Sequence, residues 1–437
     1  MSLRGKLWIL FISAAIAVYA LIGGLPITGQ LLTTQAQQPI NDAGAQIRIL
    51  ESVLQHIQND YVDEPDLNKV RAGAMRGLVG GLDPYSSYLT PEQVVDYTDG
   101  KANSEVGIGA EFSQVSLYLY VVSVMKGSTA EKAGLKAGDV VEYIGTKATR
   151  DISLYDAEQM ILGEPGSAVE LRVLRSGQKP QTLKITRESY KTPTADSRIE
   201  DGVGIVRVYS LEKGEADDVR SAVEKLTKQN IDKLVLDLRG VAKGDLEEAA
   251  KVSNLFIKEG DLAKVVGRDG KILRTYTADP SKQIFTGKLS VVMDLGTAGA
   301  GESIAAAIKE SKRAEVVGER SFGAGTEQKL FKLRGGDGLL LTVARWAAPS
   351  GAPFLGDDRD SNGVKPTIEV RRPETPQPIE VEELIDQQEK EITDPQASPS
   401  PTPKPTPVQQ KTEDMQLKKA IEVVQGKAEA AKAAAAQ

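Results

Sequence analysis

The chain has 437 residues, and its 54 Lys and Arg against 61 Asp and Glu give a formal net charge of −7 at pH 7. This acidic balance argues against a nucleic-acid-binding protein, which usually carries a basic excess. The sequence has no cysteine and one histidine, which excludes disulfides, thiolate chemistry and multi-histidine metal centres. No metal and no cofactor are expected. Any chemistry would rest on carboxylates, hydroxyls, lysine amines and backbone amides.

The N-terminus predicts export. Arg4 and Lys6 precede an uncharged, mostly apolar stretch at 7–25. Such a pattern is typical of an export signal or a membrane anchor. The lack of a convincing cleavage site favours an uncleaved anchor and leaves a cleaved signal as the alternative. Because the basic flank stays in the cytoplasm, we expect the body in the cell envelope, on the periplasmic or other extracytoplasmic side, either anchored by 7–25 or secreted.

Helical periodicity comes next. The segment 46–58 repeats apolar residues at helical spacing, and a second helix is expected near 67–79. His56 lies off the apolar stripe, so we expect it to be solvated rather than catalytic. A turn-rich segment follows at 80–85, and Thr90 with Pro91 predicts a further helix start.

From 107 to 188 the pattern changes to short strands and glycine turns. The expected elements there are strands at 117–124, 140–144, 169–174 and 182–186 and a helix at 153–162. From 202 onward strands alternate with helices, which predicts an α/β unit with a largely parallel sheet. Its expected strands lie at 203–208, 233–238 and 289–293, and its helices at 216–229, 246–257 and 303–310.

The chain beyond 370 reads as a tail. Prolines dominate 394–408, which predicts an extended linker. After it, Leu417, Ala420, Ile421 and Val424 are spaced as on one face of a short helix. We expect this helix to be solvated, with docking onto the body as the alternative.

A glycine-rich loop opens the second region. Gly107, Ile108, Gly109 and Ala110 precede a strand, and such a loop can direct successive backbone N–H groups at a carboxylate. The edge of the following strand can pair with an extended peptide. Together with the turn GLKAGD at 134–139 and the helix at 153–162, this segment resembles a PDZ domain. The resemblance implies a groove between 110–114 and 156–161 that takes a peptide C-terminus, and a blocked groove is the alternative.

Five segments point to one family. They are GLDPYSSYL at 81–89, the PDZ region, LVLDLRG at 234–240, VVGERSFG at 316–323 and LTVARWAAPSG at 341–351. In order and spacing they resemble the carboxy-terminal processing, or tail-specific, proteases. The resemblance implies a multidomain exported serine peptidase: an α/β protease-like core, an N-terminal helical region and an inserted PDZ domain, here with an extended Pro-rich C-terminal tail. The family cleaves substrates near their C-termini with a Ser–Lys pair and no histidine.

These assignments divide the chain into seven expected parts. The expected parts are a signal or membrane anchor at 1–27, a linker at 28–45, the helical region at 46–98, the PDZ domain at 103–188, the protease-like core at 190–370, a Pro-rich linker at 371–412 and a C-terminal helix at 413–437.

The family's reactive residues are replaced. In the family the Ser lies in a small-residue stretch at a helix start, and the Lys follows in Phe-Gly-Lys-Gly. Here the resemblance assigns Gly299 to the Ser position and Ala324 to the Lys position, whereas Gln328 keeps the supporting Gln. It assigns Gly240 and Ala300 to the oxyanion site. The loop GVAKG at 240–244 departs from the family's Gly-Asn-Pro-Gly-Gly.

Loss of one member of such a nucleophile–base unit can cost on the order of a million-fold in rate, so we expect catalysis to be lost. Relocated chemistry is the alternative. The hydroxyls of Thr297, Ser303 and Ser321 and the amines of Lys243 and Lys329 are the candidates for it.

The sequence therefore predicts an exported pseudoprotease that binds protein C-termini through a PDZ groove, as a scaffold or adaptor. An active serine-type endopeptidase with a relocated nucleophile is the alternative, and a purely structural role is a third. The expected partners are C-terminal segments of exported proteins and the membrane, with no nucleic acid. A homo-oligomer and a complex with an active protease relative both stay open.

Overall fold

The computed structural model describes residues 43–100, 106–115, 117–175, 178–356, 361–372 and 413–426. The chain forms two compact units, Met1–Arg71 and Ala72–Gln437. The predicted anchor at 7–25 and the proline-rich stretch at 394–408 lie outside the described residues. No helix in the described part is both long and apolar enough to cross a membrane.

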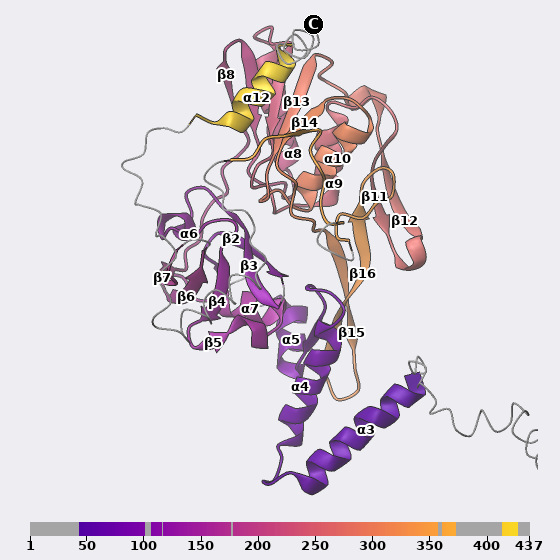
Figure 1. The fold of residues 1–437 in the computed structure, drawn as a ribbon. Helices are drawn as coiled ribbons and strands as arrows, with labels where there is room; N and C mark the ends of the chain where they lie inside the picture. Colours follow the sequence, from indigo (N-terminus) through magenta and orange to yellow (C-terminus); the bar gives the residue numbers. More distant parts are fainter. Residues whose placement is uncertain are drawn as a thin grey trace, which may run out of the picture. The chain divides into compact units, whose positions relative to one another are not determined.

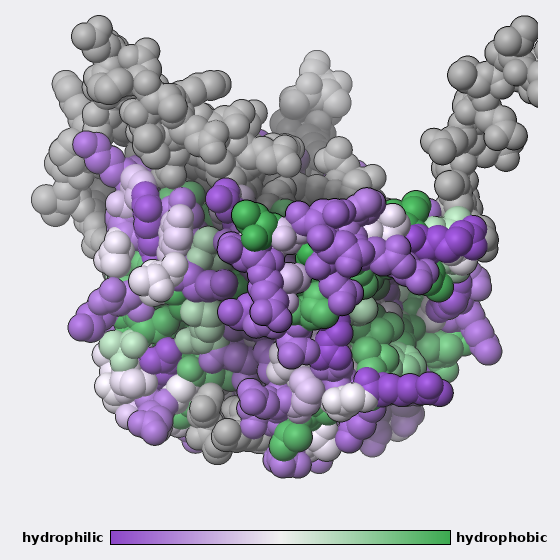
Figure 2. Space-filling view, turned by 90° about the horizontal axis from the view of Figure 1, so that it is seen from below, coloured by the Kyte–Doolittle hydropathy of each residue, from purple (hydrophilic) through white to green (hydrophobic). Residues whose placement is uncertain are grey.

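The first unit contributes α3 (Ala43–Asp60), which confirms the helix expected at 46–58. Its apolar stripe stays at the surface, and Ile47 is 63% exposed. His56 is exposed as well, and its Nδ1 lies 2.7 Å from Asp60 Oδ2, which agrees with a solvated histidine. Helix α4 (Leu67–Gly80) follows across the unit boundary. Hydrophobic residues, drawn in green, also lie between hydrophilic ones on the face shown in Figure 2.

The expected PDZ region forms an antiparallel sheet in the order β2-β3-β4-β6-β7, with β5 paired to β4. Buried side chains such as Ile108, Leu119 and Leu171 fill its core together with α7. The elements are β2 (Ala110–Val115), β3 (Tyr118–Val124), α6 (Thr129–Lys132), β4 (Val140–Ile144), β5 (Lys147–Ala148), η2 (Thr149–Asp151), α7 (Leu154–Ile161), β6 (Ala168–Leu174) and β7 (Gln181–Thr186).

The second sheet has the order β17-β14-β13-β10-β9-β8, and every neighbouring pair is parallel except β8 with β9. Alternate residues of a strand face opposite sides. Leu234 and Leu236 pack in the core that contains helices α8, α9 and α10, whereas Val235 packs on the other face. The elements are β8 (Asp196–Glu200), β9 (Val203–Arg207), α8 (Glu215–Thr227), β10 (Lys233–Asp237), α9 (Leu246–Asn254), β13 (Lys288–Met293), α10 (Ala300–Glu310), β14 (Glu315–Gly318) and β17 (Ile368–Glu369).

A third, antiparallel sheet was not expected from the sequence. Its order is β1-β16-β11-β12, and β15 also pairs with β16 (Figure 1). It joins 87–89, which precede the PDZ region, to strands of the core, a long-range pairing that strand periodicity alone does not specify. The elements are β1 (Ser87–Leu89), α5 (Pro91–Asp99), β11 (Asp261–Val266), η3 (Arg268–Gly270), β12 (Ile272–Thr277), η4 (Pro280–Lys282), β15 (Thr326–Lys332) and β16 (Gly338–Ala347).

Helix α12 (Met415–Val424) lies on the face of the parallel sheet opposite α8, α9 and α10 (Figure 1). The expectation of a solvated helix is therefore wrong. Leu417 and Ile421 are buried against strand residues such as Val235. The hydroxyl of Ser290 donates to the carbonyl of Ala420 at 3.1 Å. The helix thus covers apolar sheet surface that would otherwise face water.

The docking of α12 makes a stability prediction. Leu417→Ala and Ile421→Ala should each lower the free energy of unfolding by about 2–5 kcal/mol, because each leaves a cavity in a packed core. Met415→Ala on the same helix, where the native side chain is 45% exposed, should change it by about 0.5 kcal/mol or less. Urea unfolding of the full chain measures all three. Equal effects of the three changes would contradict the docking.

Candidate functional site

The position assigned to the family's serine lies in a sharp strand-to-helix turn. Gly299 follows β13 and immediately precedes α10, with φ 51° and ψ −105°. In α/β-hydrolases a strained turn between strand and helix presents the nucleophile, and glycine adopts positive φ without steric cost. A Cβ at Gly299 would have the Trp346 ring as its nearest neighbour, at 3.4 Å. The turn therefore has room for a small side chain and lacks one.

The buried carboxylate of Glu302 holds the site together. It accepts hydrogen bonds from the amides of Gly299 (2.8 Å), Gly323 (2.7 Å) and Ala324 (2.8 Å) and from the hydroxyl of Ser321 (2.5 Å). Burial raises the pKa of Glu302 to about 7, although these hydrogen bonds act in the opposite direction. The structure thus brings Gly299 and Ala324, the positions that the sequence analysis assigned to the family's Ser and Lys, to one carboxyl group. The sequence did not single out Glu302.

The three candidate replacement hydroxyls are all buried. That of Ser321 bridges Glu302 and the Val364 amide. That of Thr297 donates to the Leu238 carbonyl at 3.0 Å. That of Ser303 has no hydrogen-bond partner among the residues that the structure describes. Within the described residues, no lysine amine bonds to any of the three hydroxyls, so none has a base of the kind that the family uses.

The two candidate amines lie in other environments. Lys243 Nζ forms an ion pair with Glu212 at 2.9 Å. Lys329 is exposed, and its Nζ lies 5.3 Å from the centre of the Phe331 ring. Both amines thus have interactions outside the Glu302 cluster.

The two positions assigned to the oxyanion site, Gly240 and Ala300, differ in how their backbone amides are used. The amide of Gly240 donates to Asp294 Oδ1 at 2.9 Å, and its carbonyl accepts from the hydroxyl of Ser123 at 2.7 Å. That amide is therefore already used by a carboxylate. Ala300 is the first residue of α10, where amides have no partner within the helix. Of these two positions, Ala300 is thus the one whose amide lies at the start of a helix, where it can stabilise an oxyanion.

Apolar packing surrounds the position of the missing lysine. Phe322 and Ala324 belong to one cluster with buried Ala298 and with Tyr120 and Val122 of β3. The rings of Tyr120 and Phe322 stack with their centres 5.6 Å apart. A sheet of the PDZ region therefore packs directly against the core residues around Ala324.

Gln328 has hydrogen bonds of its own. Its Nε2 donates to the hydroxyls of Thr326 (2.6 Å) and Thr342 (3.4 Å). The hydroxyl of Thr342 in turn donates to Asp83 at 3.0 Å. Gln328 is thus connected to the GLDPYSSYL segment, a link that the sequence did not predict.

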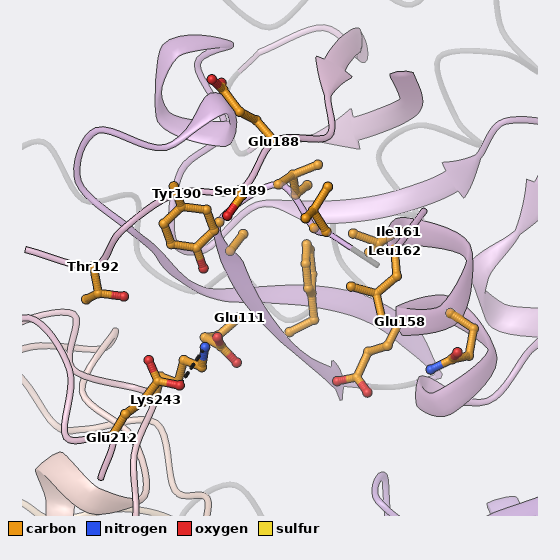
Figure 3. Close-up of a pocket in the computed structure, with 17 residues that line it drawn as sticks. Glu111, Glu158, Ile161, Leu162, Glu188, Ser189, Tyr190, Thr192, Glu212 and Lys243 are labelled. Carbon is orange, nitrogen blue, oxygen red and sulfur yellow. Dashed lines mark ion pairs between the residues drawn. The ribbon is translucent and has the colours of Figure 1, made fainter. Parts of the chain in front are cut away.

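The glycine-rich loop lines a groove of about 390 Å³ between β2 and α7 (Figure 3). Gly107, Ile108, Gly109 and Ala110 contribute one wall, and the residues of α7 and its C-terminal end, Glu158, Gln159, Ile161 and Leu162, contribute another. Gly109 has φ 79°, and a Cβ there would lie 2.3 Å from that of Ser128, so only glycine fits. The expected loop and helix therefore meet in one open groove.

Residues of the core complete this groove. Glu212 and Lys243 lie at its lower end in Figure 3, and Tyr190 lies beside the loop. The sequence placed Lys243 among the candidates for catalysis. No local pattern indicated that it would contribute to the peptide groove instead.

Comparisons with known proteins agree with this architecture. A model of the PDZ domain matches residues 120–175, and a model of peptidase family S41 matches 202–370. A probable CtpA-like serine protease of Staphylococcus aureus strain N315 is 30% identical over 83% of this chain and 73% of the relative. A protein of the same description from Staphylococcus epidermidis is 29% identical over 84% of this chain and 74% of the relative. The solved photosystem II D1 C-terminal processing protease superposes with a TM-score of 0.62, at 27% identity over 76% of this chain and 94% of that one.

The role of Glu302 can be tested by Glu302→Gln. At pH 8 the change should lower the free energy of unfolding by about 2–4 kcal/mol, because the amide NH₂ of glutamine would face two N–H or O–H donors that now bond to a carboxylate oxygen. The matched change Glu315→Gln, at an exposed position of β14, should cost about 0.5 kcal/mol or less. Urea unfolding measures both, and equal stability of the two variants would contradict the role of Glu302.

Proposed function

Because the chain belongs to peptidase family S41, we propose that it recognises protein C-termini through its PDZ groove but no longer hydrolyses them. The observation that carries this proposal is the pair Gly299 and Ala324. Both lie in an intact site around Glu302, and neither has the hydroxyl or the amine that the Ser–Lys reaction requires.

One further contact supports loss of hydrolysis. The Gly240 amide bonds to Asp294 rather than facing an open oxyanion position. This contact would therefore limit activity even in a variant with both reactive side chains restored.

Binding is supported by the groove itself. The loop 107–110 opens on a cavity large enough for an extended peptide end, and β2 is the edge strand of its sheet. An edge strand can add a peptide strand through its backbone groups. We also propose that the chain acts as a scaffold or adaptor in the cell envelope and is held there by residues 7–25. This part of the proposal rests on the sequence pattern.

The catalytic part is tested with a labelled unfolded peptide that has an apolar C-terminus, read by mass spectrometry. The native chain should not cleave it, and serine-directed phosphonylating reagents should not label the protein. Gly299→Ser combined with Ala324→Lys should be at least about tenfold more active than either single change, because the two groups act as a unit. Gly299→Ala with Ala324→Lys is the matched control without a nucleophile. Native cleavage that Thr297→Ala, Ser303→Ala or Ser321→Ala abolishes would instead show a relocated nucleophile.

The binding part is tested by amidation. A fluorescein-labelled peptide ending in Leu-Ala-Ala with a free carboxylate should bind at least about tenfold more tightly than its carboxamide, because charge-assisted hydrogen bonds of about 1.5–3 kcal/mol each are lost. Fluorescence anisotropy measures both affinities. Equal affinity for the two forms would rule out the loop 107–110 as the carboxylate site.

A further inference from the structure

The ionisable side chains that line the groove are mostly acidic. They are Glu111, Glu158, Glu188 and Glu212, with Lys243 as the single cation. Lys243 is already paired with Glu212 at 2.9 Å. The lining therefore carries excess negative charge even though the loop beside it is shaped for a carboxylate. A C-terminal carboxylate alone does not account for these acids.

Two of the acids face the hollow from opposite walls. Glu111 extends from β2, which forms one wall, and Glu158 extends from α7, which forms the other. Both carboxylates lie toward the lower edge of the pocket as drawn in Figure 3. Neither forms an ion pair within 4 Å in the described part of the chain. Glu188, in contrast, lies at the other end of the groove in Figure 3. Glu111 and Glu158 are thus the acids available to a ligand.

The groove already holds one ammonium group. Lys243 reaches it from the core, and its charge lowers the pKa of Glu111 while the charge of Glu111 raises the pKa of Lys243. Burial nevertheless raises the pKa of Glu111 to about 7, and the negative charge of Glu212 acts in the same direction. A second cation from a ligand would reduce this unfavourable burial of negative charge.

The position of Glu111 defines which part of a peptide it would contact. Glu111 directly follows Ala110, the last residue of the carboxylate loop, and a strand advances about 3.3 Å per residue. A peptide whose carboxylate lies at 107–110 and whose chain pairs with β2 therefore places one of its last four side chains beside Glu111. Glu158 faces the same stretch from α7.

We propose that the groove selects protein C-termini that carry a lysine or arginine among their last four residues, and that Glu111 and Glu158 bind this cation. The inference rests on the proposed function, since it assigns a sequence preference to the same groove. It distinguishes this chain from a binder of purely apolar C-termini.

The test uses the full chain and fluorescein-labelled ten-residue peptides with free carboxylates. Lysine is placed in turn at each of the last four positions of an alanine- and leucine-based peptide, with norleucine at the same position as the uncharged control. At least one lysine peptide should bind at pH 8 at least fivefold more tightly than its norleucine partner. Glu111→Gln with Glu158→Gln should reduce this preference to less than twofold, whereas Glu315→Gln, at an exposed position of β14 outside the groove lining, should leave it unchanged.

The pH dependence gives a second readout. Glu111 should lose its proton between pH 6 and pH 8, so the preference for lysine should grow over this range in the native chain. The charged groups that face Glu111 are Glu158, Glu212, Lys243 and, at high pH, Tyr190. Burial also raises the pKa of Glu158 to about 7, so the preference should be flat with pH only in the Glu111→Gln, Glu158→Gln variant.

The outcomes separate the two proposals. If peptides bind but lysine and norleucine are equal, or glutamate is preferred, the charge preference is wrong and the binding function stands. If a preference persists in the Glu111→Gln, Glu158→Gln variant, other residues read the cation and the assignment is wrong. If no peptide with a free carboxylate binds, the proposed function itself fails and the preference fails with it.

Discussion

The hydrogen bonds to Glu302 are the interaction on which the catalytic region depends. One buried carboxylate joins the start of α10 to the segment 321–324 through three backbone amides and one hydroxyl. Backbone amides are present whatever the side chain, so this arrangement does not require the reactive Ser or Lys. The hydrogen bonds that join these two segments therefore form with Gly299 and Ala324 at the positions that the sequence analysis assigned to the family's Ser and Lys.

The sequence predicted those parts of the fold that depend on local pattern. The apolar run ending at Leu238 predicted a buried parallel strand, and the glycine loop with α7 predicted a groove between them; the structure contains the strand and a groove at that place. The antiparallel sheet around β16 was not predictable, because β1 pairs with it across the whole PDZ region. The docking of α12 was missed for a related reason. An apolar stripe shows that a helix has an apolar face, but it does not show which surface covers that face.

At the candidate site, prediction from the sequence was limited for a different reason. Motif spacing singled out Gly299 and Ala324, and the amides of both bond to Glu302. Motif spacing did not predict where the side chain of Lys243 points. A loop that departs from the family in sequence can also depart in where its side chains point, and here the amine lies with Glu212 at the groove. The altered loop thus contributes to the binding region and, through the Gly240 amide, to an internal contact with Asp294.

The position of α12 has a consequence for biosynthesis. The strands whose outer face it covers, β9, β10, β13 and β14, all precede it in the chain, and 373–412 lie between them and the helix. Valine side chains such as Val235 and Val292 are therefore synthesised before the helix that covers them. We expect this sheet face to stay open to solvent or to chaperones until α12 has been made and has docked.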